Sequence, residues 1–196
     1  MIFHLSPCGE RVGAKKKLAL FSGTHTKGNG VRELITAWRM LHMLDWGLHI
    51  TGYGDMTEEL RRLAALCEGV VFHALVSRKE LVSLMCSAAI GINPHELSQT
   101  PGNVFAFKII EYLGAGAHVV TTRMGVLEPE IEAGIAYISD NTPDTIAAGL
   151  KRVIDDGHLK KTARSAALER YGSKAVSEGL DACLRDVTRK CRRPGR

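Results

Sequence analysis

Short apolar runs rich in β-branched residues alternate about six times with longer amphipathic segments, and Gly, Pro, Asn or Asp marks each change. This alternation is typical of a parallel sheet, because parallel strands can be joined only by long, usually helical, connections. We therefore predict an α/β fold: a doubly wound, Rossmann-like parallel sheet of about six strands with extra C-terminal helices. The predicted strands are Lys17–Gly23, Leu48–Gly52, Val70–Ala74, Ala89–Asn93, His118–Thr122 and Ala136–Ser139. The predicted helices are Gly30–Leu44, Thr57–Glu68, Arg78–Ala88, Val104–Leu113, Glu128–Ala133, Asp144–Asp156, Leu159–Tyr171 and Ala175–Arg189.

The domain organisation follows from where this alternation begins and ends. Residues 1–16 mix Pro, Gly and charge without periodicity, so we expect a linker or arm. Residues 17–157 hold the alternating pattern and should form one Rossmann-like domain. Residues 158–196 should supply C-terminal helices and a basic tail.

Positive charge is concentrated near the C-terminus. Residues 151–196 carry 13 Lys and Arg against 6 Asp and Glu, whereas the net charge of the whole chain is only +5. Such a stripe can contact an anionic membrane surface or simply water, and both interpretations stay open. Nucleic acid is not expected as a partner, because the stripe lacks interleaved aromatic side chains for base stacking.

Nothing in the sequence indicates export or membrane insertion. Residues 1–17 contain no apolar core suited to a signal peptide, and nowhere do about 18 apolar residues follow one another. The five cysteines are odd in number and form no CxxC pair, which predicts reduced thiols and no metal site. We expect a cytoplasmic protein that can lie peripherally at the inner face of a membrane.

The turn after the first predicted strand, Phe21–Gly30, suits a phosphate group. Glycine lets a ligand approach the backbone, free N–H groups at a helix start attract anions, and a lysine adds a positive charge. The turn matches neither the P-loop nor the dinucleotide fingerprint, so an ordinary glycine-rich turn stays an alternative. For its histidine, a ligand contact and a solvent-exposed turn position are both open. The candidate ligand residues are Gly23, Thr24, His25, Lys27 and Gly28.

The next two predicted strands also end in residues that suit a ligand. Gly52 and Gly54 lie at the carboxyl edge, where open parallel sheets bind their ligands, and leave room for a base or ribose. Backbone around Val76 can contact the edge of a base, although a plain turn explains this segment as well. No third glycine completes a dinucleotide fingerprint, which argues against an NAD-binding domain.

The most specific segment is Asn93–Thr122, in which a loop leads into a helix that begins near Asn103. Lys108 and Glu111 lie three residues apart, so both side chains can converge on one ligand from the same helical face. A lysine can neutralise a diphosphate while a carboxylate accepts hydrogen bonds from ribose hydroxyls. The alternative is an ordinary surface salt bridge between the two residues.

Together these segments resemble the C-terminal domain of the retaining GT-B glycosyltransferases of group 1, over about residues 17–156. That family has a glycine-ended strand followed by a Lys-Gly pair, then a GxG at the end of the next strand. Its most recognisable helix reads F-x-x-K-x-x-E-Y-x-A-x-G and is followed by a Val-Val strand. The matching residues here are Gly23, Lys27, Gly28, Gly52, Tyr53, Gly54, Phe105, Lys108, Glu111, Tyr112, Gly116, Val119 and Val120.

The resemblance implies a role for each candidate. Lys27 and Lys108 would neutralise the donor diphosphate, and Glu111 would hold the ribose. Asn103 stands where the family usually has a glutamate, so it can hydrogen-bond a sugar but cannot act as a carboxylate. The implied catalytic set is Lys27, Lys108 and Asn103. The implied nucleotide-binding set is Gly23, Thr24, His25, Gly28, Gly52, Gly54, Val76, Val104, Phe105 and Glu111.

The resemblance also implies a reaction: metal-independent transfer of a sugar, with retention, from a UDP- or GDP-sugar to a saccharide or lipid acceptor, with no cofactor. Such enzymes serve polysaccharide or glycolipid biosynthesis and carry the acceptor on an N-terminal domain. We expect this chain to lack that domain, to be inactive alone and to be able to form homo-oligomers. The alternative is a non-catalytic nucleotide-sugar-binding module or subunit, and an epimerase of the same fold is a further one.

Overall fold

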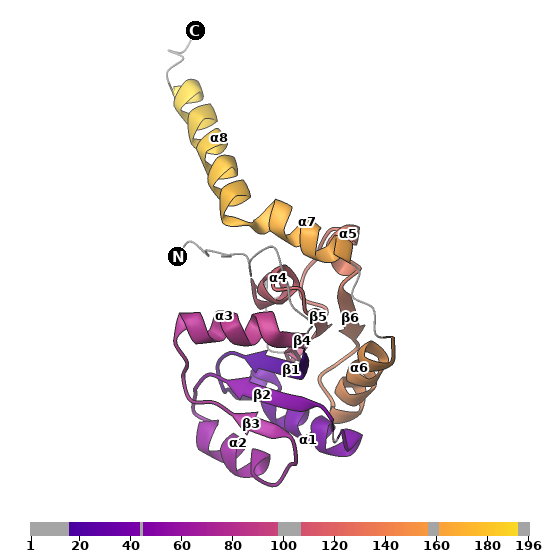
Figure 1. Ribbon diagram of the computed structural model, residues 1–196. Coiled ribbons are helices and arrows are strands. Elements are labelled where there is room, and N and C mark those ends of the chain that lie inside the picture. Colours follow the sequence, from indigo (N-terminus) through magenta and orange to yellow (C-terminus); the bar gives the residue numbers. More distant parts are fainter. Residues whose placement is uncertain (1–15, 44, 98–106, 157–160, 192–196) are drawn as a thin grey trace.

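Six strands form one parallel sheet in the order β3-β2-β1-β4-β5-β6 (Figure 1). The computed structural model describes residues 16–43, 45–97, 107–156 and 161–191. The strand order reverses between β1 and β4, as in doubly wound sheets, so the predicted fold class is confirmed. The strands are β1 (Lys16–Ser22), β2 (Gly47–Thr51), β3 (Val70–Phe72), β4 (Ala88–Asn93), β5 (His118–Thr122) and β6 (Ile135–Ile138).

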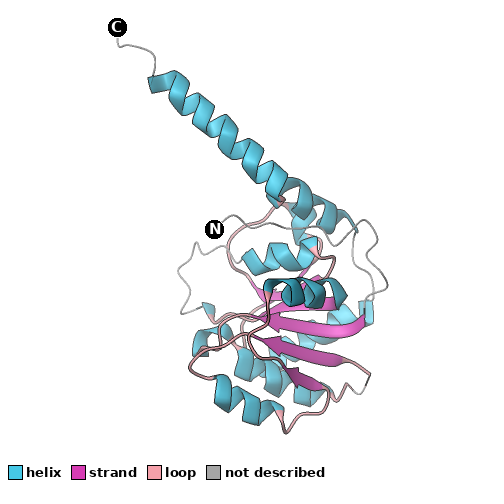
Figure 2. Cartoon of the chain, turned by 60° about the vertical axis from the view of Figure 1, so that its left-hand side comes forward, coloured by secondary structure: helices cyan, strands magenta, loops and turns pink. Residues whose placement is uncertain are grey.

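Helices cover both faces of this sheet (Figure 2). One face carries α1 (Val31–Leu41), α2 (Thr57–Ala64) and α6 (Pro143–Asp156). The other carries α3 (Arg78–Ser87), α4 (Phe107–Gly114), α5 (Pro129–Glu132) and α7 (Lys161–Tyr171). A single 3-10 turn, η1 (Lys27–Asn29), precedes α1, and α8 (Ser173–Cys191) extends away from the α/β body (Figure 1).

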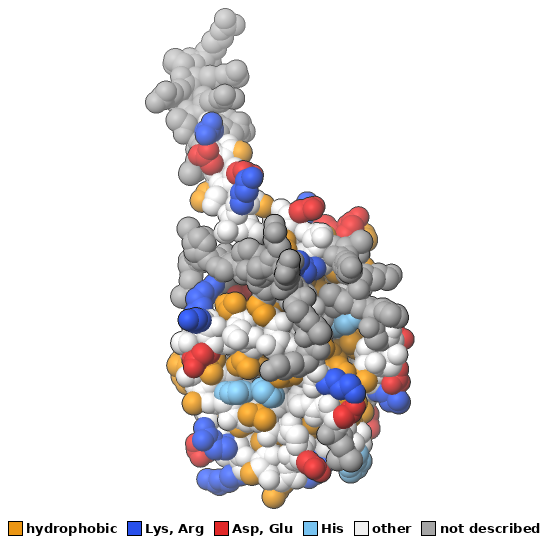
Figure 3. Space-filling model, viewed as in Figure 1, with side chains coloured by type: hydrophobic (Ala, Val, Ile, Leu, Met, Phe, Trp, Pro, Cys, Tyr) orange, Lys and Arg blue, Asp and Glu red, His pale blue; other side chains and the backbone are white. Residues whose placement is uncertain are grey.

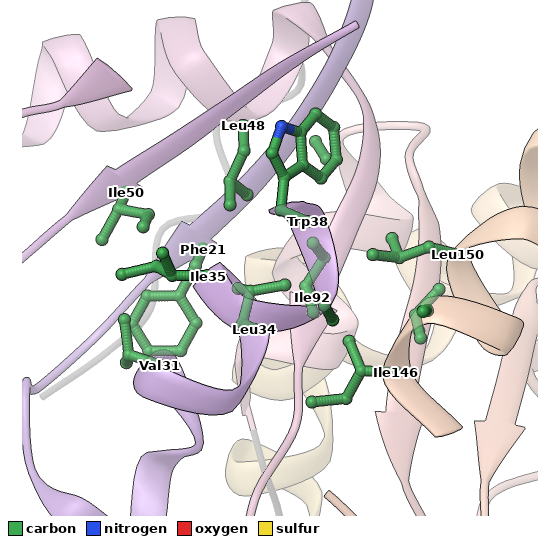
Figure 4. Close-up of a cluster of buried hydrophobic side chains, with 14 of the residues drawn as sticks. Phe21, Val31, Leu34, Ile35, Trp38, Leu48, Ile50, Ile92, Ile146 and Leu150 are labelled. Carbon is green, nitrogen blue, oxygen red and sulfur yellow. The ribbon is translucent and has the colours of Figure 1, made fainter. Parts of the chain in front are cut away.

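Two apolar clusters, one on each face, hold the sheet and helices together. In β1 the side chains alternate: Phe21 joins the cluster under α1 and α6, whereas Leu20 joins the cluster under α3 and α4. Trp38 of α1 is 1% exposed and belongs to the first cluster, as do Leu34 and Ile146 (Figure 4). Because both faces of β1 are buried, the strand reads as a continuous apolar run, as central parallel strands do.

Several predicted boundaries move by a few residues, for local reasons. The predicted helix to Leu44 ends at Leu41, because His42 adopts a left-handed backbone conformation with φ of 46°. The third strand ends at Phe72 rather than Ala74, although the backbone N–H of His73 still donates to the carbonyl of Ile50 over 2.8 Å. The predicted start of α3 is confirmed: Ser77 and Glu80 cap it reciprocally.

The cysteines differ from the expectation of reduced thiols. Cys67 is a buried free thiol, whereas Cys86 is disulfide-bonded. The expectation is therefore wrong for Cys86, because spacing along the chain does not record which cysteines meet in space.

Candidate functional site

The loops after β1 and β2 pack so closely that they need glycine. The backbone N–H of Gly23 donates to the carbonyl of Thr51, and that of His25 donates to Tyr53, each over 3.0 Å. A Cβ on Gly52 would lie 1.8 Å from the carbonyl oxygen of Gly23, and one on Gly54 would lie 2.4 Å from that of His25. The two glycines thus let the first two strand ends form one floor.

The loop after β1 is also joined to the loop after β4, across the switch point of the sheet. Gly30 has φ of 68°, and a Cβ there would lie 2.1 Å from the carbonyl oxygen of Pro94. The backbone N–H of Glu96 donates to the carbonyl of Gly28 over 2.9 Å. These contacts fix the carboxyl ends of β1, β2 and β4 relative to one another, at the edge where such sheets bind ligands.

A cavity of about 310 Å³ opens at this edge, between the strand ends and α4. Its size is close to the lower limit of ordinary small-molecule pockets, about 300 Å³. Six of the predicted site residues line it together: Gly23, Thr24, Gly52, Val76, Lys108 and Glu111. The structure therefore brings residues from four separate segments of the chain to one cavity.

Lys108 places its ammonium group against the first strand end. A Cβ on Gly23 would lie 2.7 Å from Nζ of Lys108, and Nζ lies 5.2 Å from the centre of the Phe21 ring. Burial lowers the pKa of Lys108 from 10.5 to about 8, and attraction to Glu111 offsets only part of this effect. Within the described parts of the chain, Lys108 forms no ion pair, so its charge is available to an anion in the cavity.

Glu111 lies one helical turn further along α4 and lines the same cavity. Burial raises the pKa of its carboxyl group, while the positive charges of Arg78 and Lys108 oppose the rise. A half-buried carboxylate can accept hydrogen bonds from neighbouring hydroxyl groups of a ligand. Lys108 and Glu111 therefore present a donor and an acceptor to one space, and no ion pair joins them within the described residues.

Lys27 and His25 do not line this cavity. Lys27 is exposed on η1, at the same edge of the sheet but outside the lining. His25 is 0% exposed, and its Nδ1 lies 3.0 Å from Oγ1 of Thr57 while its ring packs edge-on against Phe72. Burial lowers the pKa of His25, so its ring is a neutral part of the loop packing.

The remaining candidates divide into two groups. Gly28 and Gly54 hold the loops together through the contacts described above and do not line the cavity. Asn103, Val104 and Phe105 lie outside the described residues. Their assignment as phosphate or sugar contacts stays a prediction.

Sequence reasoning missed other residues at the site. Five further residues line the cavity: Ser22, Thr51, Tyr53, Leu75 and Leu81. The position of Ser22, Thr51 and Leu75 at or just beyond strand ends is a signal that could have found them. His95 is also near: burial, and then repulsion from Lys108, lower the pKa of this histidine to about 4, which keeps it neutral.

A known protein family matches the part of the chain that forms the sheet. The family profile described as glycosyl transferases group 1 matches residues 16–156. No curated protein sequence matches the chain significantly.

Solved structures with the same fold come from several organisms. Sucrose-phosphate synthase from Thermosynechococcus elongatus superposes with a TM-score of 0.71 over 91% of this chain, at 18% identity. The pneumococcal O-GlcNAc transferase GtfA, solved with UDP and GlcNAc, gives a TM-score of 0.69 over 90% of this chain, at 16% identity. This chain spans 47% of the synthase chain and 37% of the transferase chain.

A third structure corresponds more closely in length. The C-terminal domain of the group 1 glycosyl transferase LpcC from Francisella tularensis gives a TM-score of 0.59 at 18% identity, with coverage of 84% of this chain and 86% of that one. At these identities the likenesses show a shared fold.

Proposed function

Since this chain belongs to the glycosyl transferases of group 1, we propose that it binds the nucleoside-diphosphate sugar donor of a retaining glycosyltransferase. The donor would lie in the cavity at the carboxyl edge of the sheet. Its diphosphate would contact Lys108 and the backbone of the β1 loop, and its ribose hydroxyls would contact Glu111. Lys27, exposed at the same edge, would add a second positive charge to the phosphates.

One observation carries this proposal: Lys108 and Glu111 line one cavity with glycine-rich strand ends, and Lys108 is partly buried there at the cost of a lowered pKa. An unpaired buried ammonium destabilises a fold, so its retention beside glycine backbone supports an anionic ligand. Sugar transfer requires above all that a departing diphosphate be stabilised, and an ammonium in a water-poor cavity suits that task. No metal ion is needed for this role, and we propose none.

UDP is the first ligand to test. The pneumococcal transferase was solved with UDP and GlcNAc, and a Staphylococcus aureus TarM mutant was solved with UDP and a GlcNAc-glycerol. Tyr53 and Leu75, 65% and 70% exposed, line the cavity and offer apolar surface to a base beside the backbone of Val76. GDP is the second ligand to test, because backbone contacts alone select weakly between bases.

The test is calorimetric titration of the purified chain with UDP, GDP and NAD. We expect UDP or GDP to bind and NAD to bind far less. Glu111→Gln should lose the preference for UDP over 2′-deoxy-UDP, because Glu111 would hold the ribose hydroxyls. Glu169→Gln, an exposed residue of α7, is the matched control and should bind as the unaltered chain does. Equal binding of UDP and its deoxy analogue by the unaltered chain would refute the role of Glu111.

The transfer reaction itself is a separate part of the proposal. We propose a saccharide or lipid acceptor and retention at the anomeric carbon, with the acceptor held by another domain or subunit. The alternative is a module that binds the nucleotide sugar without turnover. Incubating the chain with UDP-sugars and acceptors distinguishes the two, since only transfer releases UDP together with a glycosylated product.

The C-terminal helix suggests a second contact. No helix within the described residues has both the length and the apolar content needed to cross a bilayer. On α8, Val176 and Leu180 are 48% and 57% exposed and lie one helical turn apart, and residues 151–196 as a whole carry 13 Lys and Arg against 6 Asp and Glu. We propose that this segment contacts an anionic membrane surface. Co-sedimentation with phosphatidylserine vesicles should exceed that with phosphatidylcholine vesicles, and Leu180→Glu should reduce it; equal binding to both would refute the proposal.

A further inference from the structure

Two histidines lie in contact on the sheet face opposite α1 and α2. Leu48 and Ile50 of β2 belong to the buried cluster under α1, so the side chain of His49 between them points to the other face. His73 follows β3, the edge strand. Figure 3 shows histidine side chains gathered at the surface over β2 and β3.

The ring nitrogens of this pair converge. Nε2 of His73 lies 3.0 Å from Nδ1 of His49, with ring centres 4.9 Å apart and ring planes inclined by 46°. The backbone on both sides is held by the sheet: His49 pairs with Val71, and the N–H of His73 donates to the carbonyl of Ile50 over 2.8 Å. His49 is therefore positioned by β2, and His73, the first residue after β3, is held beside it by a backbone hydrogen bond to β2.

We propose that His49 and His73 form a binding site for a divalent transition-metal ion, with Zn²⁺ as the probe. Two imidazole nitrogens bound to one tetrahedral zinc ion lie about 3.3 Å apart. The ion would replace the hydrogen bond between the two rings, so the pair would open by a few tenths of an ångström and the rings would turn until both lone pairs face the ion. Imidazole nitrogen suits Zn²⁺, Ni²⁺ and Cu²⁺, whereas Mg²⁺ prefers oxygen ligands. Each neutral ring has one nitrogen proton, so both rings can bind the ion as tautomers protonated at the other nitrogen.

The number of ligands determines what kind of site this is. Within the described part of the chain, no group of three or more His, Cys, Asp and Glu side chains could hold a metal ion. Water would complete the coordination, so the ion should exchange readily, unlike the ion of a closed structural site. It would connect β2 to the start of the segment that carries Leu75 and Val76, two residues of the cavity wall. The site is distinct from the donor cavity, and its test does not depend on the proposed function.

The experiment uses the full chain without a histidine tag, titrated with ZnCl₂ by calorimetry and by thermal unfolding. We expect one Zn²⁺ per chain and a Tm that rises with Zn²⁺ concentration, with no such effect of MgCl₂. His49→Gln and His73→Gln should each weaken Zn²⁺ binding by about tenfold or more, as loss of even an outer-sphere partner commonly does. His42→Gln is the matched control, since His42 is exposed at the end of α1, and should bind as the unaltered chain does.

A second measurement keeps the test independent of how the variants fold. In the unaltered chain, Zn²⁺ should shift the ring ¹⁵N resonances of His49 and His73 and leave that of His42 in place. Absence of Zn²⁺ binding by the unaltered chain, binding by both variants as tight as that of the unaltered chain, or shifts confined to other histidines would each overturn the proposal.

Discussion

Replacing Lys108 by methionine should weaken UDP binding and at the same time stabilise the unliganded protein. Methionine keeps the length and apolar stem of lysine but removes the ammonium group. In the folded chain that ammonium is buried beside Gly23, and burial lowers the pKa of Lys108 from 10.5 to about 8. Binding sites commonly contain residues that bind the ligand but reduce the stability of the unliganded protein, whereas residues of a hydrophobic core stabilise it.

The magnitude follows from linkage between protonation and folding. A shift from 10.5 to about 8 corresponds to about 3 kcal/mol at pH 7, where the ammonium is protonated in both folded and unfolded chains. Between pH 8 and 10.5 the unfolded chain binds more protons than the folded chain, so the stability of the unaltered protein rises with pH in this window. The stability advantage of Lys108→Met should therefore fall from about 3 kcal/mol at pH 7 to about 1.4 kcal/mol at pH 9.5.

Urea unfolding at pH 7 and pH 9.5 measures this advantage, and calorimetry with UDP measures the loss of binding. Losing a partly buried charge contact to the diphosphate should cost about 2–4 kcal/mol, or roughly 30- to 1000-fold in Kd. Lys151→Met is the matched control: Lys151 is exposed on α6 with its charge paired to Asp155, so its replacement should change stability by about 0.5 kcal/mol or less at either pH. A Lys108→Met protein that is less stable than the unaltered one at pH 7, or that binds UDP equally well, would refute the reasoning.

Three further substitutions, with Gly179→Ala as a control, test the packing that positions the site. Tyr112→Phe removes a buried hydroxyl that accepts from the backbone N–H of Ser22 over 2.9 Å, so urea unfolding should show a loss of about 1–3 kcal/mol; no loss would mean that water replaces the bond. Gly91→Ala would bring a Cβ to 2.2 Å from the Tyr112 ring, so it should lower the free energy of unfolding by about 1–3 kcal/mol. Gly179→Ala in α8, with no described atom within 4 Å of the new Cβ, should raise it by up to about 1 kcal/mol. Similar unfolding midpoints for the two variants would contradict this. Ser77→Ala removes the cap of α3 and should cost about 1 kcal/mol, seen as a lower Tm, and an unchanged Tm would show that the cap adds nothing.

Much of the fold could be predicted, because its determinants are local. The alternation of apolar strands with amphipathic helices fixes a parallel sheet, and the capping pair Ser77 and Glu80 fixes the start of α3. Lys108 and Glu111 were predictable as a pair, since helical spacing alone places them on one face. Their meeting with Gly23 and Gly52 followed from the rule that parallel strands end at the same edge.

What could not be predicted depends on contacts between distant segments. His25 was expected either to contact a ligand or to be exposed, but the approach of the β2 loop, made possible by Gly52 and Gly54, covers it completely. The hydrophobic periodicity of a sequence does not indicate which loops approach each other in the folded chain. Likewise His49 and His73 are 24 residues apart, and only the register of β2 with β3 brings their nitrogens to 3.0 Å.

At the carboxyl edge of the sheet, two histidines are neutral while a lysine stays mostly protonated, and this difference supports an anion site. His25 and His95, which follow β1 and β4, are neutral because burial lowers the pKa of each. Lys108, buried in the same region, has a pKa of about 8 and is therefore still mostly protonated at neutral pH. A core position would select against that lysine, since methionine fills the same space without the desolvation penalty. Among the described residues, the region thus retains a costly ammonium that faces a cavity beside two neutral histidines, and attraction to Glu111 offsets only part of the cost. Binding a diphosphate accounts for such an ammonium, whereas folding alone does not.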